Sequence, residues 1–176
     1  MAYMVISSSL NPDSKSRLLA RAVFHTLQNM GASVQWLDLE ERSLPLCDGD
    51  LVYEKTEVIE LKDTIKQTEG ILLAVPIYNF SGNAAAKNLI ELTGNAWSNK
   101  VVGFLCAAGG KGSYMSVMTL ANSLMLDFRC LISPRFVFAS KSDFGDDKLG
   151  NMHIANEEIK ERIAELAQMM VRLARI

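Results

Sequence analysis

Three short segments of this chain carry residue types that could hold a ligand, and the first of them suits an anion. It follows an apolar N-terminal run and reads Ser7-Ser8-Ser9-Leu10-Asn11-Pro12-Asp13-Ser14-Lys15-Ser16-Arg17. Its serine and asparagine donors stand just before a helix-period stretch, whose free N–H groups and dipole favour a negative charge. About four charge-assisted hydrogen bonds, each contributing roughly 1.5–3 kcal/mol, could hold a phosphate ester. The alternative is that Asp13 or Ser14 only caps the helix and the other residues form a turn.

The second segment suits a flat aromatic ligand. It reads Pro76-Ile77-Tyr78-Asn79-Phe80-Ser81-Gly82-Asn83 and directly follows a buried apolar run. A heteroaromatic ring needs an apolar or aromatic wall together with donors and acceptors along its edge, and this segment can supply both. The alternative is an ordinary strand-to-helix turn in which Asn83 caps the helix and Tyr78 packs in the core.

The third segment is rich in glycine and reads Ala107-Ala108-Gly109-Gly110-Lys111-Gly112-Ser113. Glycines allow a backbone to approach a ring closely, although a flexible loop without a ligand explains the same residues. Each segment alone is weak evidence for a site. The three become stronger evidence together if the fold brings them to one place.

Apolar runs alternate with stretches of helical period along the whole chain, and this alternation predicts how the three segments are positioned. The predicted strands are 3–6, 33–39, 70–76, 101–108 and 130–138. The predicted helices are 14–30, 57–68, 83–97, 113–127 and 151–176, and 39–55 is irregular. This βα order predicts an α/β fold, a five-stranded parallel sheet with helices on both faces. Ligands bind beyond the carboxyl ends of the strands in such sheets, where all three segments are expected.

Composition limits the remaining possibilities. The 176 residues carry 18 Lys and Arg against 20 Asp and Glu, a formal charge of −2, and 49% are apolar. A single domain over 1–176 is expected, and a nucleic-acid partner is disfavoured because such binders are strongly basic. No apolar run reaches the ~20 residues that span a bilayer, and the N-terminus lacks the basic region of a signal peptide. A cytoplasmic protein without membrane contact is the expectation.

Hydrolase and metal chemistry find little support. His25 and His153 fall on predicted helices away from the three segments, and no cluster has metal-ligand spacing. Cys106 begins a stretch similar in outline to a Cys-x5-Arg phosphatase loop, but position 112 is glycine. The odd count of cysteines (Cys47, Cys106 and Cys130) predicts reduced, unreactive thiols.

Taken together, the patterns of the three segments resemble those of one family. They are Ser-Ser-Ser-Leu-x3-Ser-x-Ser-Arg-x-Leu-Ala from Ser7 to Ala20, Pro-x-Tyr-Asn-x-Ser from Pro76 to Ser81 followed by Lys87-Asn88, and Ala-x-Gly-Gly from Ala107 to Gly110. In this order they cover nearly the whole chain. The chain resembles the NADPH-dependent FMN reductases of the flavodoxin-like superfold.

The resemblance implies a flavodoxin-like three-layer sandwich with FMN at the edge of the sheet. Ser9, Ser14 and Ser16 would take the phosphate, and Asn11 and Lys15 belong to the same implied site. The ribityl chain and ring would lie along Pro76, Ile77, Tyr78, Asn79, Phe80 and Ser81, with Ala108, Gly109 and Gly110 towards the pyrimidine side.

The same resemblance implies the activity. Hydride would pass from NADPH or NADH to FMN, and electrons then to a flavin, quinone, azo compound or metal ion. The chemistry belongs to the flavin, so no catalytic side chain and no metal ligand is expected. The family is commonly a homodimer or homotetramer whose partner subunit helps to close the site. A non-catalytic FMN electron carrier and a redox sensor are the alternatives, and the charge of −2 disfavours the carrier because carriers tend to be much more acidic.

Two departures from the family pattern bear on the site. Many members have arginine where this chain has Asn11, so the phosphate loses a positive charge unless Lys15 or Arg17 supplies it. Gly82-Asn83-Ala84 stands where the family often has Pro-Gly.

The predicted third and fourth helices are also rich in apolar residues, which indicates either a dimer surface or one generous core. These residues are Leu89, Ile90, Leu92, Trp97, Met115, Met118, Leu124, Met125 and Phe128.

Overall fold

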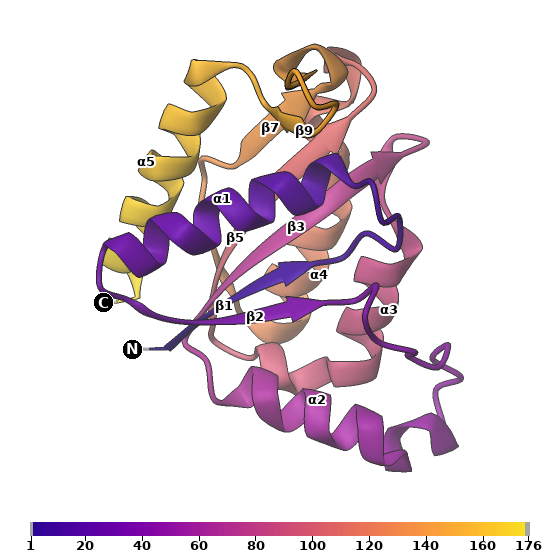
Figure 1. Cartoon of the computed structure of the whole chain (residues 1–176). Helices are drawn as coiled ribbons and strands as arrows, with labels where there is room; N and C mark the ends of the chain where they lie inside the picture. Colours follow the sequence, from indigo (N-terminus) through magenta and orange to yellow (C-terminus); the bar gives the residue numbers. More distant parts are fainter. Residues whose placement is uncertain (1, 175–176) are drawn as a thin grey trace.

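A computed structural model, which describes residues 2–174, contains one twisted parallel sheet at its centre (Figure 1). Its main strands run in the order β2 (Ser33–Asp38), β1 (Ala2–Ser7), β3 (Gly70–Tyr78) and β5 (Val101–Ala108). Beyond β5, the short strands β6 (Leu131–Ile132) and β7 (Val137–Ser140) pair with it in turn. This is the doubly wound order of flavodoxin-like sheets, so the predicted fold class is confirmed.

Helices cover both faces of the sheet. One face carries α1 (Lys15–Asn29) and α5 (Glu157–Leu173), which lie side by side. The other carries α2 (Thr56–Lys66), α3 (Ala84–Thr93) and α4 (Met118–Phe128). Short 3-10 turns complete the elements: η1 (Leu51–Glu54), η2 (Gly94–Trp97), η3 (Lys111–Val117) and η4 (Lys141–Asp143).

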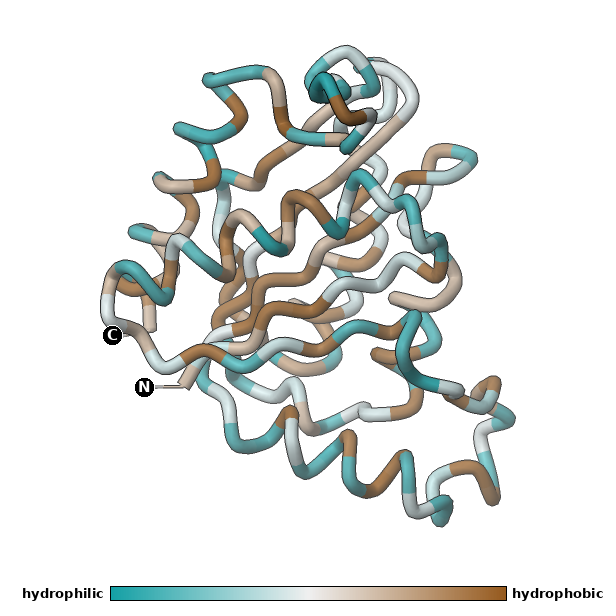
Figure 2. Tube along the Cα trace, in the orientation of Figure 1, coloured by the Kyte–Doolittle hydropathy of each residue, from teal (hydrophilic) through white to brown (hydrophobic). Residues whose placement is uncertain are grey.

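The core forms because the central strands are apolar on both sides, as the continuous apolar runs predict (Figure 2). Successive residues of β3 alternate between the two helical layers. Ile71 and Leu73 pack with α2 and α3, whereas Leu72 and Ala74 pack with α1 and α5. Most of the apolar residues that indicated a dimer surface or a generous core lie in this core, among them Leu89, Ile90, Leu92, Trp97 and Leu124, while Met115 and Met125 are exposed.

The predicted end of the third strand at Pro76 is wrong. The strand β3 continues to Tyr78 and turns back as β4 (Ser81–Gly82) in a short antiparallel hairpin. Pro76 is tolerated because the backbone N–H that it lacks would point towards β1, which has already ended at this level of the sheet. Ala74, two residues earlier, faces the same side, and its carbonyl accepts a hydrogen bond from the N–H of Ser8 just beyond the end of β1. No ladder hydrogen bond is therefore lost at the proline.

The second half of the chain departs further from prediction. The predicted strand 130–138 is two short strands separated by residues 133–136, and the predicted helix 113–127 begins only at Met118. The predicted helix from 151 begins at Glu157, where the Asn156 side chain accepts a hydrogen bond from the N–H of Glu158. Residues before it form the hairpin β8 (Phe144–Asp146) and β9 (Met152–Ile154), so His153 lies on a strand. The predicted helix end at Ile176 lies outside the described residues.

The remaining predictions concern smaller features. The predicted helix 83–97 ends at Thr93 because Gly94 has a positive φ, and a 3-10 turn follows. All three cysteines are free, and burial raises the pKa of the Cys106 thiol and raises that of Cys130 to about 11. Among residues 2–174 no helix is long and apolar enough to cross a membrane.

Candidate functional site

A cavity of about 620 Å³ opens at the carboxyl edge of the sheet, between the three segments that the sequence singles out. Its volume falls in the range of about 300–1,000 Å³ that is typical of small-molecule sites. The predicted site residues that line it are Ser9, Asn11, Ser14, Lys15, Ser16, Pro76, Ile77, Tyr78, Asn79, Ala108 and Gly109. The fold thus brings segments about 60 and 100 residues apart in sequence to one place, as expected of the carboxyl ends of parallel strands.

Three predicted residues do not line this cavity, and three lining residues were not predicted. Phe80 lies exposed at the tip of the hairpin, Ser81 pairs with Tyr78, and Gly110 precedes η3. The additional lining residues are Asp13, Ala107 and Lys141. Lys141 follows β7, whose last residue, Ser140, is in register with Ala108. Continuing the predicted strand to Ser140 would have placed this lysine at the same edge.

The first segment combines helix capping with a set of outward donors. The Ser14 hydroxyl accepts a hydrogen bond from the N–H of Arg17 at 3.2 Å and lies 3.0 Å from the Ser16 hydroxyl. Within the described residues, the N–H groups of Lys15 and Ser16 have no backbone acceptor. Ser14 therefore caps α1 and also lines the cavity, so capping and ligand binding are compatible.

The first and second segments are joined by one buried amide. Asn83 Nδ2 donates to the Ser8 carbonyl at 2.7 Å, and the Ser8 hydroxyl lies 2.8 Å from both Asn83 Oδ1 and the Ala74 carbonyl. Asn83 stands at the start of α3, but its side chain makes no capping bond there. Asn83 thus occupies the N-cap position of α3, as the capping interpretation expects, but its side chain holds the two loops together instead of capping the helix.

The tip of the hairpin is built on two left-handed residues, Asn79 with φ of 50° and Phe80 with φ of 60°. A two-residue hairpin turn of type I′ has positive φ at both positions, which asparagine tolerates and glycine prefers. Phenylalanine is a poor residue for this conformation, and its side chain here is 73% exposed. Phe80 therefore carries backbone strain that burial of its side chain within the chain does not offset. Strained residues are common at functional positions.

Replacing Phe80 with glycine is expected to stabilise the chain without ligand by about 1 kcal/mol, because the left-handed cost disappears and little buried surface is lost. Urea unfolding of the two proteins measures the difference. A Phe80→Gly variant that unfolds at a lower urea concentration than the wild type would contradict this interpretation of the turn.

The cavity offers two cations and one carboxylate. Lys15 and Lys141 line it together with Asp13. The Lys15 ammonium lies 5.9 Å from the centre of the Phe144 ring on β8. Arg17 does not line the cavity, because its guanidinium pairs with Asp38 of β2 at 2.6 Å. Of the two residues expected to replace the missing arginine, only Lys15 is thus in place.

The residues of this cavity fit FMN. Hydroxyls, helix N–H groups and Lys15 gather at one end, which suits a phosphate. At the other end, a side chain added to Gly109 would meet no described atom within 4 Å, so bare backbone faces open space. Pro76, Ile77 and Tyr78 supply an apolar wall. Residues 2–174 contain no group of three His, Cys, Asp or Glu side chains placed to hold a metal ion.

The doubly wound sheet, with a cavity at its carboxyl edge, defines a protein of the flavodoxin-like fold. Residues 1–144 match the NADPH-dependent FMN reductase family, and the chain belongs to that family. It is 29% identical to an NADPH:quinone oxidoreductase of Arabidopsis thaliana over 96% of this chain and 91% of that protein. It is 24% identical to an NADPH azoreductase of Bacillus sp. (strain OY1-2) over 91% of each chain.

A solved structure supports the fold independently. The flavoenzyme NAD(P)H:(acceptor) oxidoreductase FerB from Paracoccus denitrificans superposes with a TM-score of 0.78 over 99% of this chain and 97% of that chain, at 20% identity. The predicted family is thus confirmed. The protein is an oxidoreductase that works with FMN and NAD(P)H.

Proposed function

We propose that the cavity at the carboxyl edge binds FMN and that the protein passes electrons from NAD(P)H to a quinone or an azo compound. The observation that carries the proposal is the convergence of the Ser9–Ser16 segment, the Pro76–Asn79 segment and Gly109 on one cavity. The names of the two relatives support these two acceptor classes. Bound FMN supplies the chemistry, since its ring can accept hydride and then release electrons to an acceptor.

The chain's own residues bind and orient. Ser9, Ser14, Ser16 and Lys15 would hold the phosphate with the first N–H groups of α1. The backbone from Pro76 to Asn79 and from Ala107 to Gly109 would line the ring. These residues would hold the ring where a nicotinamide could lie close to it, and close positioning of two reactants is itself a large part of the rate. No proton transfer by a side chain is needed.

Exposed apolar side chains beside the cavity support a homodimer or homotetramer. Phe80, Tyr78, Tyr114 and Met115 are all exposed, and β4 lies against η3, which carries the last two. Tyr114 stacks on Phe136 with ring centres 4.7 Å apart. A second copy packed on this surface would bury it and help to close the cavity.

A cytoplasmic location is proposed because the three free thiols suit a reducing compartment.

A spectrum and a turnover assay test this proposal. The purified chain, incubated with FMN and freed of excess, should retain a yellow flavin spectrum that bleaches on addition of NADPH or NADH. Addition of a benzoquinone or an azo dye should then give continuous nicotinamide oxidation. A protein that stays colourless would contradict the proposed site. Bleaching without turnover on any acceptor would favour the redox-sensor alternative.

A further inference from the structure

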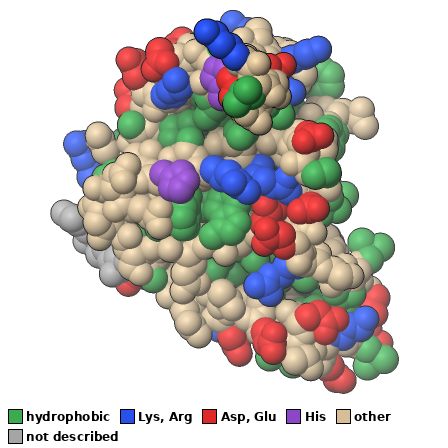
Figure 3. Space-filling view, in the orientation of Figure 1, with side chains coloured by type: hydrophobic (Ala, Val, Ile, Leu, Met, Phe, Trp, Pro, Cys, Tyr) green, Lys and Arg blue, Asp and Glu red, His purple; other side chains and the backbone are tan. Residues whose placement is uncertain are grey.

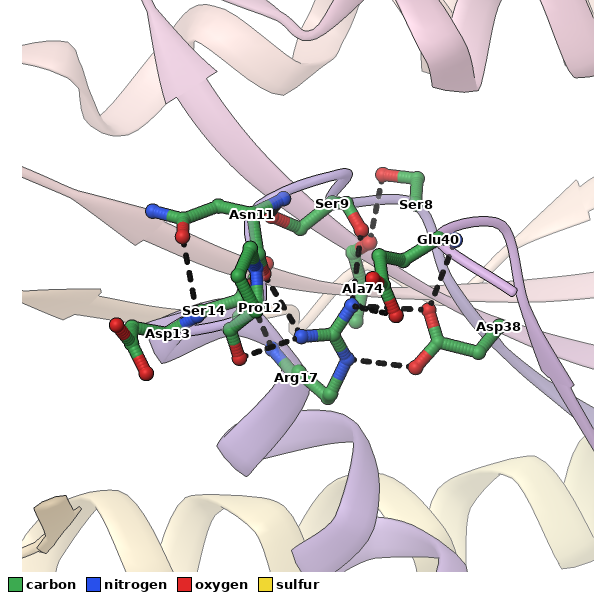
Figure 4. Close-up of polar contacts among 11 residues, drawn as sticks. Ser8, Ser9, Asn11, Pro12, Asp13, Ser14, Arg17, Asp38, Glu40 and Ala74 are labelled. Atoms are coloured by element: carbon green, nitrogen blue, oxygen red, sulfur yellow. Dashed lines mark hydrogen bonds and ion pairs between the residues drawn. The ribbon is translucent and has the colours of Figure 1, made fainter. Parts of the chain in front are cut away.

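Arg17 and Asp38 form a buried ion pair directly beneath the first segment (Figure 4). Arg17 lies in the first turn of α1, and Asp38 ends the neighbouring strand β2. Their side chains are only 8% and 2% exposed, and Arg17 Nε donates to Asp38 Oδ2 at 2.6 Å while Nη2 donates to Oδ1 at 3.2 Å. A buried pair of this kind is costly to form and is better evidence of a specific structural task than of stability.

The remaining donors of the guanidinium hold the loop. Nη1 donates to the carbonyls of Asn11 at 2.7 Å and Pro12 at 2.8 Å, and Nη2 donates to the carbonyl of Ser9 at 3.2 Å. An arginine has five N–H donors, and these contacts together with Asp38 account for all of them. Arg17 therefore has no donor left for a ligand.

These contacts decide which groups of the loop can face an anion. Three carbonyl oxygens, which would repel a phosphate, are drawn onto the guanidinium and away from the cavity. Five donor-bearing residues of the same loop and helix start line the cavity, namely Ser9, Asn11, Ser14, Lys15 and Ser16. The charge of Arg17 is also balanced, because Asp38 contacts it directly and Glu40 lies 3.8 Å from Nη2.

We propose that Arg17 and Asp38 are positioning residues that hold the first segment in its phosphate-binding shape, and that Arg17 is not itself a phosphate ligand. The pair thereby sets the preference of the site for FMN over riboflavin, the same ring system without a phosphate. This inference rests on the proposed FMN site. It differs from the simpler view in which Arg17 replaces the charge missing at Asn11.

Asp38→Asn separates the two views because they predict opposite signs. If Arg17 attracted the phosphate directly, removal of the Asp38 charge would tighten FMN binding. As a positioning pair, the residues lose their alignment and FMN binding weakens by at least about tenfold. Riboflavin affinity should change by less than about twofold, because riboflavin makes no phosphate contact. Flavin fluorescence titrations of the full chain without bound flavin measure both constants.

Two further variants complete the test. Glu40→Gln also removes a carboxylate near Arg17 but no contact to the loop, so FMN binding should stay within about twofold of wild type. Arg17→Lys keeps the charge but loses the planar fork, and FMN binding should weaken by about tenfold with riboflavin binding retained.

The outcomes of the test are distinct. Wild-type protein that fails to bind FMN defeats the proposed function. Wild-type binding together with unchanged or tighter FMN binding by Asp38→Asn overturns the positioning role alone. Loss of riboflavin binding by both Asp38→Asn and Arg17→Lys also overturns it, because the pair would then support the fold as a whole.

Discussion

Replacing Gly109 with leucine is expected to weaken FMN binding by about ten- to a hundredfold while the chain still folds. Gly109 lines the cavity, its φ is not in the left-handed region, and a Cβ there would meet no described atom within 4 Å. The added side chain therefore causes no clash within the protein but occupies space proposed for the flavin ring. Overpacking typically costs about 1–3 kcal/mol, and every 1.4 kcal/mol is tenfold in affinity.

The matched control for this change is Gly112→Leu. Gly112 is also free of described neighbours around its Cβ position, but it lies in η3 and does not line the cavity. Fluorescence titration should show near wild-type FMN affinity for Gly112→Leu and an affinity about ten- to a hundredfold lower for Gly109→Leu, with similar thermal unfolding for both. Equal FMN affinity in the two variants would place the flavin ring elsewhere.

Replacing Lys15 with glutamate should weaken FMN binding by about a hundredfold and leave riboflavin binding almost unchanged. The substitution turns a cation that lines the cavity into an anion beside the proposed phosphate position. Two unit charges about 4 Å apart interact by roughly 1 kcal/mol in bulk water and by roughly 4 kcal/mol near a protein surface. Reversing the sign of one charge changes the interaction free energy by about twice this amount. Glutamate in the first turn of α1 suits the helix dipole, so folding should not suffer.

Asn11→Arg is the counterpart with the opposite sign. It restores the arginine of the family pattern at a residue that lines the cavity. FMN affinity should rise about tenfold in the same titration. A Lys15→Glu variant that loses FMN and riboflavin equally would contradict a phosphate role for Lys15, as would an Asn11→Arg variant that binds FMN less tightly than wild type.

The surface charge of the protein fits recognition by a few local groups. Figure 3 shows acidic and basic side chains interspersed on the face that it displays. In the proposed site, phosphate binding would therefore depend on Lys15, the hydroxyls and the helix N–H groups rather than on a broad positive field. The large separation expected between FMN and riboflavin affinities follows from this local arrangement.

The sequence predicted the central sheet well because its strands are buried on both faces. A fully buried strand has to be a continuous apolar run, and Val101–Ala108 was predicted with the bounds that the structure shows. Gly31, which directly follows the predicted first helix 14–30, has a φ of 75°, as suits a residue just beyond a helix. Most lining residues of the cavity were predicted because parallel strands end at one edge whatever the details of their packing.

Features that depend on contacts distant in sequence could not be predicted in the same way. The hairpin after β3 requires knowing that β1 ends opposite Ala74, which makes Pro76 harmless. The strand β9 is only three residues long and shows no clear alternation of apolar and polar residues. The predicted helix from 151 therefore included it. The sequence shows that Arg17 is charged but does not show that it pairs with Asp38 on the neighbouring strand β2.

A crystal structure of the full chain with FMN bound tests the central claim most directly. The account predicts the FMN phosphate among Ser9, Ser14, Ser16 and Lys15, with the ring beside Gly109 and the Pro76–Asn79 segment. The guanidinium of Arg17 should remain on Asp38 and the loop carbonyls. Density for FMN outside this cavity, or a phosphate seated directly on Arg17, would contradict it.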